Sequence, residues 1–223
     1  NTLADVYKWT TTYEAVTLTA PTQGYWMLHT GAQTYNYPAI QIVAHDPIPL
    51  TAGWNMIGGY ENSPLVSGLT TTPANLIVPG TVYGWSGTYS NAANLIPGYG
   101  YWVLSTGIGV INPPTLADGP AKLIAQDDKS QWGKITITDA SGKSYTLYSV
   151  NGEVNLDQYQ MPPLPPAGMF DIRFGSGRIA EDLTSSIQSI LMSGIEHPVR
   201  VKVENMKINL QDESGKEINT ELK

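Results

Sequence analysis

The chain has no cysteine among its 223 residues, which excludes disulfide bonds, thiol catalysis and cysteine-ligated zinc. Charged residues are also scarce at 14%, against about a quarter in an ordinary globular protein. The 12 basic and 19 acidic residues give a net charge of −7, and binding to nucleic acid requires clustered Lys and Arg. No run of 18 apolar residues is present. We therefore expect no nucleic-acid partner and no membrane span.

The residues that are abundant favour β structure. Apolar residues make up 41% of the chain, which together with the low charge argues against disorder. There are 22 Gly and 16 Pro, more than a helical protein tolerates, whereas an all-β protein uses them in its turns. Aromatic residues are mainly Tyr (13) and Trp (6), with only 2 Phe, and the first two have a high strand propensity. The composition predicts an all-β fold.

A repeat organises the first half of the chain. Residues 6–38 recur without a gap at 82–114, which is 76 positions later. The recurring residues are mostly aromatic residues, Gly and Pro, and they include these pairs: Trp9 and Trp85, Tyr13 and Tyr89, Pro21 and Pro97, Tyr25-Trp26 and Tyr101-Trp102. A repeat identifies the building unit of a fold. Here the unit consists of short aromatic strands separated by turns.

The chain divides into two predicted domains, 1–117 and 118–223, at a stretch rich in Pro and Gly over 112–120. Residues 1–120 hold one basic residue and five acids, and the remainder holds the other 11 basic residues and 14 acids. In the first domain we expect strands at 24–28, 39–43, 53–59 and 100–104. Ser86-Gly87 predicts a hairpin turn, and the equivalent Thr10-Thr11 has poorer turn chemistry, so the two copies should differ there.

The second domain is predicted to be a β-sandwich of immunoglobulin or fibronectin type. Apolar and polar residues alternate over 132–138, 144–148 and 199–203, and 170–174 is a further strand. The Pro-rich segment 161–166 must lie at a sheet edge or bridge two sheets. Residues 181–192 form either a helix or a strand built on Ile187, Ile190 and Leu191. A last hairpin is expected from 207 onward, with its turn at 213–216.

Parts of both domains resemble known sequences. The motifs at 132–137 (WGKITI), 161–168 (MPPLPPAG) and 170–174 (FDIRF) resemble a segment found near the C-termini of large secreted bacterial proteins exported by the type IX secretion system. The motifs at 53–57 (GWNMI) and 97–102 (PGYGYW) are similar to repeats in the same kind of protein. The resemblance implies an extracellular or cell-surface location and a non-catalytic role beside enzymes, adhesins or repeat arrays.

No catalytic or metal-binding pattern stands out. The three histidines lack a spacing such as His-x-x-x-His: His29, His45 and His197. Asp127-Asp128 lacks the flanking residues of a calcium loop. A glycosidase needs two carboxylates in a cleft, and the first domain offers only Glu14 and Glu61, of which Glu14 aligns with Ser90 in the second copy. We therefore predict no enzyme, no cofactor and no metal, with an enzyme as a third option behind the two hypotheses below.

The leading hypothesis from the sequence is a carbohydrate-binding or adhesion module. The face of a sugar stacks on Trp or Tyr, and its hydroxyl groups form hydrogen bonds with polar neighbours. The candidates near turns are Trp9, Tyr13, Trp85, Tyr89 and Tyr99, and the partner would be a polysaccharide or a cell-surface glycan. Three further tryptophans are predicted to lie in the core: Trp26, Trp54 and Trp102. In Tyr25-Trp26 and Tyr101-Trp102, adjacent residues face opposite sides of a strand, so one of each pair should be buried and the other displayed.

The alternative is a structural subunit of a cell-surface filament or layer that associates with copies of itself. The strand at 54–57 precedes the second copy, and the matching strand of the first copy would fall before Asn1. A missing strand would leave an open edge that a neighbouring chain could fill. A second phasing pairs 54–57 with 132–135, a shift of 78, and would remove the argument for an open edge.

Overall fold

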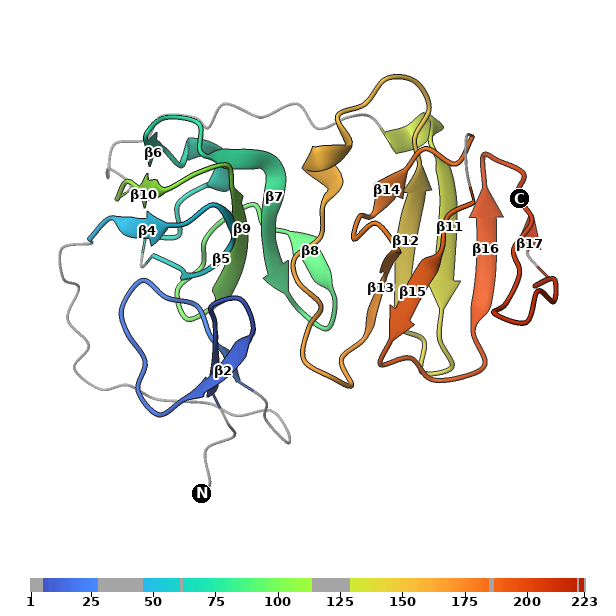
Figure 1. Ribbon diagram of the computed structural model, residues 1–223, viewed down its shortest axis with the longest axis horizontal. Helices are drawn as coiled ribbons and strands as arrows, with labels where there is room; N and C mark the ends of the chain where they lie inside the picture. The colour runs from blue at the N-terminus through green and yellow to red at the C-terminus, as the bar shows by residue number, and fades with distance from the viewer. Residues whose placement is uncertain are drawn as a thin grey trace. The chain divides into compact units, whose positions relative to one another are not determined.

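The computed structural model describes residues 6–27, 46–60, 62–113, 129–184, 187–219 and 221–222. Over these residues the protein is all-β, as predicted, with mostly antiparallel sheets (Figure 1). Its described helices are three short 3-10 segments: η1 (Val66–Gly68), η2 (Lys129–Gln131) and η3 (Leu156–Tyr159). The chain forms two compact units, Asn1–Trp85 with Ser90–Ile124, and Ser86–Tyr89 with Ala125–Lys223. The predicted strand at 39–43 and most of the predicted linker lie outside the described residues.

The described residues of the first unit form three sheets, with strand orders β2-β1-β3, β5-β9-β7-β8 and β4-β10-β6. Short strands follow from the sequence, because Gly, Pro, Ser or Thr interrupts each apolar run within a few residues. Their bounds are β1 (Val6–Trp9), β2 (Tyr13–Val16), β3 (Trp26–Met27), β4 (Ile48–Leu50), β5 (Gly53–Gly58), β6 (Thr71–Thr72), β7 (Ile77–Trp85), β8 (Tyr89–Asn91), β9 (Gly100–Ser105) and β10 (Gly109–Ile111).

The two copies of the repeat have the same strand register. Tyr7 of β1 pairs with Trp26 of β3, and 76 residues later Tyr83 of β7 pairs with Trp102 of β9. Both pairings are antiparallel, and in each copy a further hairpin strand, β2 or β8, lies on the other side of the first strand. The recurring aromatic residues therefore recur in equivalent positions of two equivalent sheets.

A tyrosine hydroxyl closes the turn before the last strand in each copy. The backbone N–H of Ala20 donates to the Tyr25 hydroxyl at 2.7 Å, and the N–H of Ile96 donates to the Tyr101 hydroxyl at 2.7 Å. Between these residues the chain passes through a positive φ, 68° in the first copy and 78° in the second. Gly98 adopts this conformation freely in the second copy, whereas the first copy has Thr22, a β-branched residue strained there.

The hairpin turns of the two copies are partly alike. The N–H of Thr10 donates to the carbonyl of Thr12 at 3.1 Å, and the N–H of Ser86 donates to the carbonyl of Thr88 at 3.2 Å. Gly87 has a φ of 90°, whereas no residue of the Thr10–Thr12 turn has a positive φ. The prediction that the copies differ is right for the backbone conformation and wrong for the closing hydrogen bond.

Strand β5 lies between the two copies. On one edge it pairs with β9 along its whole length, from Gly53 opposite Ser105 to Gly58 opposite Gly100. On the other edge the N–H of Gly58 donates to the carbonyl of Thr22 at 3.0 Å. The N–H of Gly24, two residues before β3, donates to the carbonyl of Met56 at 3.1 Å. One strand thus serves both copies, and the edge that the sequence predicts to be open is partly occupied by β5.

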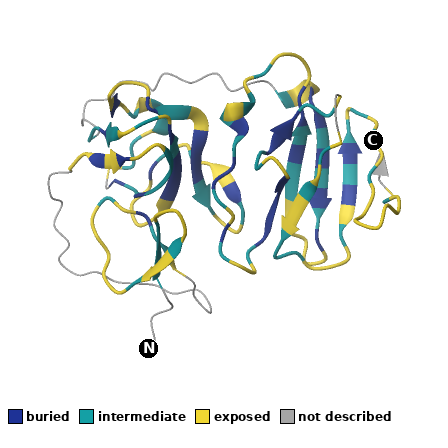
Figure 2. Ribbon diagram, viewed as in Figure 1, coloured by how far each residue is buried: buried dark blue, intermediate teal, exposed yellow. Residues whose placement is uncertain are grey.

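Strand β9 is the centre of the first unit. One of its faces carries Tyr101 and Val103, which join a core formed between two of the sheets. The buried members of that core are Ile48, Leu50, Ile57, Tyr60, Leu76, Val82, Leu95, Tyr101, Val103 and Ile111. The other face carries Trp102, which is also buried, and Figure 2 shows β9 mostly in the buried colour. A continuous apolar run such as Tyr-Trp-Val-Leu is typical of a strand covered on both faces.

In the second unit the residues that the structure describes form a five-stranded sheet, β14-β12-β11-β16-β17, and a two-stranded sheet, β13-β15. Strand β11 pairs along its length with β12 and with β16, both antiparallel, while β14 and β17 join as parallel edge strands. These parallel pairs and the two-stranded second sheet depart from the antiparallel immunoglobulin pattern. The bounds are β11 (Gly133–Thr138), β12 (Ser144–Ser149), β13 (Asp171–Phe174), β14 (Ala180–Glu181), β15 (Ile190–Ser193), β16 (Arg200–Glu204) and β17 (Glu221–Leu222).

Alternation of side chains builds the core of the second unit. Ile135 and Ile137 of β11 share one buried core with Ile172 and Phe174 of β13, and the alternate residues of β11 are half-buried. The predicted strands at 132–138, 144–148, 170–174 and 199–203 are confirmed within one or two residues. The described part of 181–192 is not helical, since β14 ends at Glu181 and β15 begins at Ile190. The second phasing of the repeat is not supported, because β11 occupies a different sheet environment from β5.

Candidate functional site

Reciprocal tryptophan pairs join the two copies of the repeat. The Trp9 ring packs edge-on against Trp102, with centroids 5.3 Å apart and planes at 77°. Trp26 packs in the same way against Trp85, at 5.1 Å and 70°. Trp9 and Trp85 are equivalent residues of the two copies, and so are Trp26 and Trp102. Each contact therefore joins a tryptophan of one copy to a tryptophan of the other, and the repeat exchanges the two contacts.

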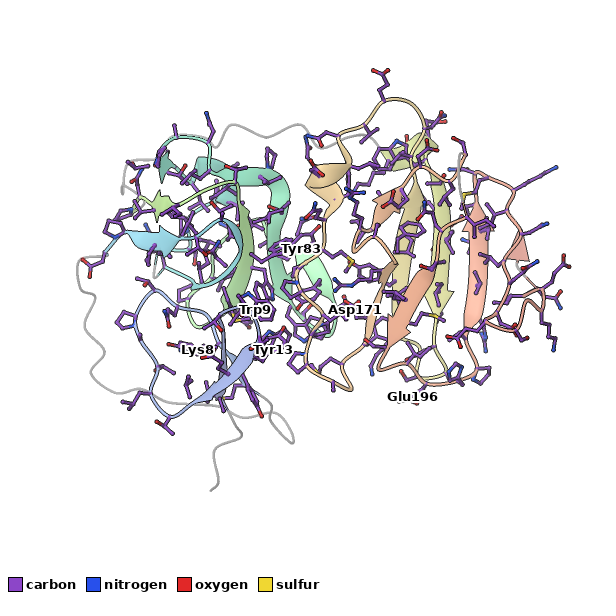
Figure 3. The ribbon with its side chains drawn as sticks, viewed as in Figure 1. Lys8, Trp9, Tyr13, Tyr83, Asp171 and Glu196 are labelled. Carbon is purple, nitrogen blue, oxygen red and sulfur yellow. The ribbon has the colours of Figure 1, made fainter. Side chains whose placement is uncertain are left out.

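Further rings extend the first of these pairs into a cluster. Tyr13 packs edge-on against Trp9, with centroids 5.1 Å apart and planes at 67° (Figure 3). Trp54 of β5 lies 6.3 Å from Trp102 and 6.1 Å from Tyr83, again with steeply inclined planes. We call Trp9, Tyr13, Trp54, Tyr83 and Trp102 the aromatic junction. Its rings meet edge to face, except for the tilted contact of Trp54 with Tyr83, and they form no coplanar row against which a sugar could lie.

The predicted binding residues have different environments. Tyr13, Trp9 and Trp85 are half-buried, and Trp9 and Trp85 pack against other tryptophans across the repeat. Tyr89 is buried, with 2% of its surface exposed, and Tyr99 is 59% exposed. Of the five candidates, only Tyr99 presents most of its ring to solvent.

Tyr89 is held within the second unit, to which its segment Ser86–Tyr89 belongs. Its hydroxyl donates to the carbonyl of Pro163 at 3.1 Å, and its own carbonyl accepts from the Tyr145 hydroxyl at 3.1 Å. Both hydrogen bonds are partly buried. Burial and these contacts leave Tyr89 unsuited to a displayed binding face, which corrects the prediction made from its place near a turn.

The predictions about buried tryptophans are partly right. Trp102 lies in the core with 3% exposed, as expected, whereas Trp26 and Trp54 are half-buried. The expectation that one of Tyr101 and Trp102 would be displayed is wrong, because Tyr101 is also only 5% exposed. Opposite faces of β9 are both covered, one by the apolar core and the other by the aromatic junction.

The Pro-rich segment lies against the face of β13 that carries Asp171 and Arg173. Asp171 and Arg173 of β13 point away from the apolar core, yet each is only 4% exposed. Arg173 donates through Nε and Nη2 to the two carboxylate oxygens of Asp171, at 2.6 and 2.7 Å. Its Nη1 donates to the carbonyl of Pro162 at 2.6 Å. Each guanidinium nitrogen and both carboxylate oxygens of this buried, bidentate ion pair thus form a hydrogen bond, and the pair fixes the Pro-rich segment on β13.

A lysine lies over two aromatic rings in the same unit. Lys129 Nζ is 5.0 Å from the ring centre of Tyr148 and 5.1 Å from that of Tyr159. Trp132 packs edge-on against both rings and is buried. The arrangement is a cation–π contact inside the chain. Nothing in the sequence singled it out, since Lys129 and Tyr159 are 30 residues apart and the rings come from separate segments of the chain.

The acidic and histidine candidates show no catalytic arrangement within the described residues. Glu14 is exposed; it accepts from the Thr10 hydroxyl at 2.6 Å and lies 3.2 Å from Lys8 Nζ, and the two contacts lower its pKa. Its proposed partner Glu61, two histidines (His29, His45) and Asp127-Asp128 lie outside the described residues. His197 is exposed. In the part of the chain that the structure describes, no group of three or more His, Asp or Glu is placed to hold a metal ion.

Comparison with models of protein families, with curated proteins and with solved structures finds no match to this chain. No helix among the described residues has the length and apolar character needed to cross a membrane.

Proposed function

We propose that the chain is a non-catalytic structural module that takes part in assembly at a bacterial cell surface. The exported setting rests on the resemblance of the motifs at 132–137, 161–168 and 170–174 to secreted proteins. The structural role is supported by the use of the repeated aromatic residues. They hold the two copies together, and a residue packed in this way contributes to stability rather than to ligand binding.

The observation that carries the proposal is a group of exposed apolar side chains in and beside one strand. In the second unit, strand β15 displays Leu191 and Met192, which are 46% and 42% exposed, and Ile187 just before it is fully exposed. An exposed apolar strand edge is a site for pairing with another strand. The first copy of the repeat is a weaker candidate for such pairing, because β5 already pairs with residues 22–24, which lead into β3.

Light scattering coupled to size-exclusion chromatography tests the proposal directly. A structural module should form dimers or larger species as its concentration rises. A parallel pull-down with insoluble polysaccharides should recover none of it. A protein that stays monomeric at every concentration, or that binds a polysaccharide while monomeric, would overturn the structural role.

Carbohydrate binding is the second candidate, and Tyr99 is the observation that favours it. This ring is 59% exposed and follows the Pro97-Gly98 turn, next to Ile96, which is 48% exposed. A flat exposed ring can stack on a sugar. If this function is correct, Tyr99→Ala abolishes polysaccharide binding, whereas Trp85→Ala acts only through stability.

A further inference from the structure

Strand β15 is one of the two strands of the smaller sheet in the second unit. It pairs with β13 in antiparallel register, from Asp171 opposite Ser193 to Phe174 opposite Ile190. No other described segment forms a β-bridge with β15, so its second edge carries no strand within the described residues. The larger sheet of the same unit has five strands. The smaller sheet therefore has room for pairing at the edge of β15.

The residues around this edge have no protection against pairing. The segment 187–194, Ile-Gln-Ser-Ile-Leu-Met-Ser-Gly, contains no charged residue and no proline. Natural edge strands are commonly protected by charges or proline, which make pairing with another chain unfavourable. The edge strand β14 of the larger sheet illustrates this protection, since Glu181 lies in it and forms an ion pair with Arg178 at 3.2 Å.

The direction of the backbone groups in β15 follows from one hydrogen bond. The N–H of Gly175 donates to the carbonyl of Ser189 at 2.8 Å, so the backbone groups of Ser189 point toward β13. Backbone groups alternate in direction along a strand. Those of Leu191 therefore also point toward β13, and the N–H and C=O groups of Ile190 and Met192 point toward the free edge.

We propose that β15 pairs antiparallel with β15 of a second copy of this chain, with Leu191 opposite Leu191 across a two-fold axis. The proposal rests on the structural function proposed above and names its interface. In this register Ile190 of each chain lies opposite Met192 of the other. Each of these two pairs exchanges two hydrogen bonds, which makes four in all, and a continuous sheet β13-β15-β15-β13 results.

This register keeps like side chains on the same face of the joined sheet. Ile190 and Met192 lie on the face of the sheet that carries Ile172 and Phe174, where Ile190 packs on the apolar core, and Leu191 lies on the face that carries Arg173. Apolar residues thus meet apolar residues on both faces. Pairing by any register that differs by one residue would place Leu191 against the core-facing side chains instead.

The charges near the axis permit two identical chains to approach. Arg173 lies directly opposite Leu191 in the β13–β15 pair, so a two-fold axis at Leu191 brings two of these cations into the same region. Each is buried and already neutralised by the carboxylate of Asp171 in the same chain. The edge therefore offers apolar surface and unpaired backbone without a net repulsive charge, which fits an identical partner.

Single cysteines test the register, because the chain has none of its own. In Leu191→Cys the two Cα atoms would face each other at about 4.5 Å, within the range of about 4.4–6.8 Å that a disulfide requires. In Met192→Cys, a control of nearly equal exposure, the same geometry places them about 9 Å apart, which is too far. Leu164→Cys, at a 50% exposed position of the Pro-rich segment, measures random collision.

Mild oxidation of the three variants should give disulfide-linked dimer at least about tenfold faster for Leu191→Cys than for either control, because pairing raises the effective concentration of the thiols. Equal rates for the three variants would overturn the register. Faster cross-linking of Met192→Cys would overturn it as well.

A charge at the axis tests the interface itself. Leu191→Lys places two ammonium groups opposite each other and should convert the dimer to monomer in light scattering, whereas Ile108→Lys, at a 79% exposed position of the first unit, should not. Circular dichroism of both variants verifies that they fold. Association that survives in Leu191→Lys would refute this interface and leave the structural function standing. A monomeric wild-type protein would refute both.

Discussion

Replacing the tryptophans that join the two copies tests whether the repeat acts as internal scaffold. Trp102 is 3% exposed, and Trp102→Leu should cost about 2–4 kcal/mol of the free energy of unfolding, because a large side chain is lost from a packed site. Trp9 is half-buried, and Trp9→Leu should cost about 1–2 kcal/mol. These single costs do not separate the ring contact from ordinary burial, so a double-mutant cycle is needed.

The cycle measures the coupling between the two rings. The edge-to-face contact at 5.3 Å should give a coupling of about 0.5–1.5 kcal/mol between Trp9→Leu and Trp102→Leu. The pair Trp26 and Trp85, at 5.1 Å, should give a similar value. Trp9 and Trp85 pack on different tryptophans, so their cycle is the matched control, and its coupling should stay within about 0.5 kcal/mol of zero.

Urea unfolding followed by far-ultraviolet circular dichroism is the appropriate assay, because tryptophan fluorescence changes with the substitutions themselves. The free energies of unfolding used in the cycle are those of the urea transition whose midpoint changes in Trp102→Leu. Couplings in the two reciprocal pairs no larger than in the control pair would refute the reasoning. The repeated tryptophans would then contribute by burial alone, and their reciprocal arrangement would have no energetic meaning.

Two further predictions concern single side chains. Lys129→Gln should lower the free energy of unfolding of the second unit by about 0.5–2 kcal/mol, since it removes a cation from the faces of Tyr148 and Tyr159. Lys129→Arg keeps the cation and should retain most of this stability in the same urea assay. Equal losses in both variants would exclude the cation–π contribution. Burial raises the pKa of Tyr60 to about 12 from 10.0, so folding favours its neutral form, and the stability this provides is complete below pH 10 and is lost as the pH rises toward 12. In an absorbance titration of tyrosinate, the variant Tyr60→Phe should therefore lack one tyrosine that ionises late in the wild-type protein. If the missing tyrosine is one that ionises near pH 10, the raised pKa is contradicted.

Local sequence signals predicted several of the strands and turns. Alternation over 132–138 predicts β11 within one residue, because a half-buried strand needs apolar residues at every second position. The repeat identified one building unit, and in the structure its two copies share a register, Tyr7 with Trp26 and Tyr83 with Trp102. These features depend on interactions between residues that are close in sequence or repeated in it.

Exposure of the candidate binding residues was not predictable from the same signals. Position near a turn suggested that Tyr89 and Tyr99 would both be displayed, yet Tyr89 is 2% exposed and Tyr99 is 59% exposed. The difference arises because the Tyr89 hydroxyl meets the carbonyl of Pro163, which is 74 residues away in the chain. Similarly, Ile187, Ile190 and Leu191 were recognised as a possible strand, but whether its outer edge is covered depends on the whole sheet order.

By itself, the sequence determined that this protein is built of short β-strands, that one aromatic unit occurs twice, and that no familiar catalytic motif is present. Only the tertiary structure decided that Trp9 meets Trp102 and Trp26 meets Trp85, and that β15 keeps an apolar edge exposed. The physical reason is that strand and turn preferences are short-range properties of the backbone and its side chains. Burial is set by whichever distant segment packs on a surface, and a pattern along one strand contains no information about that segment.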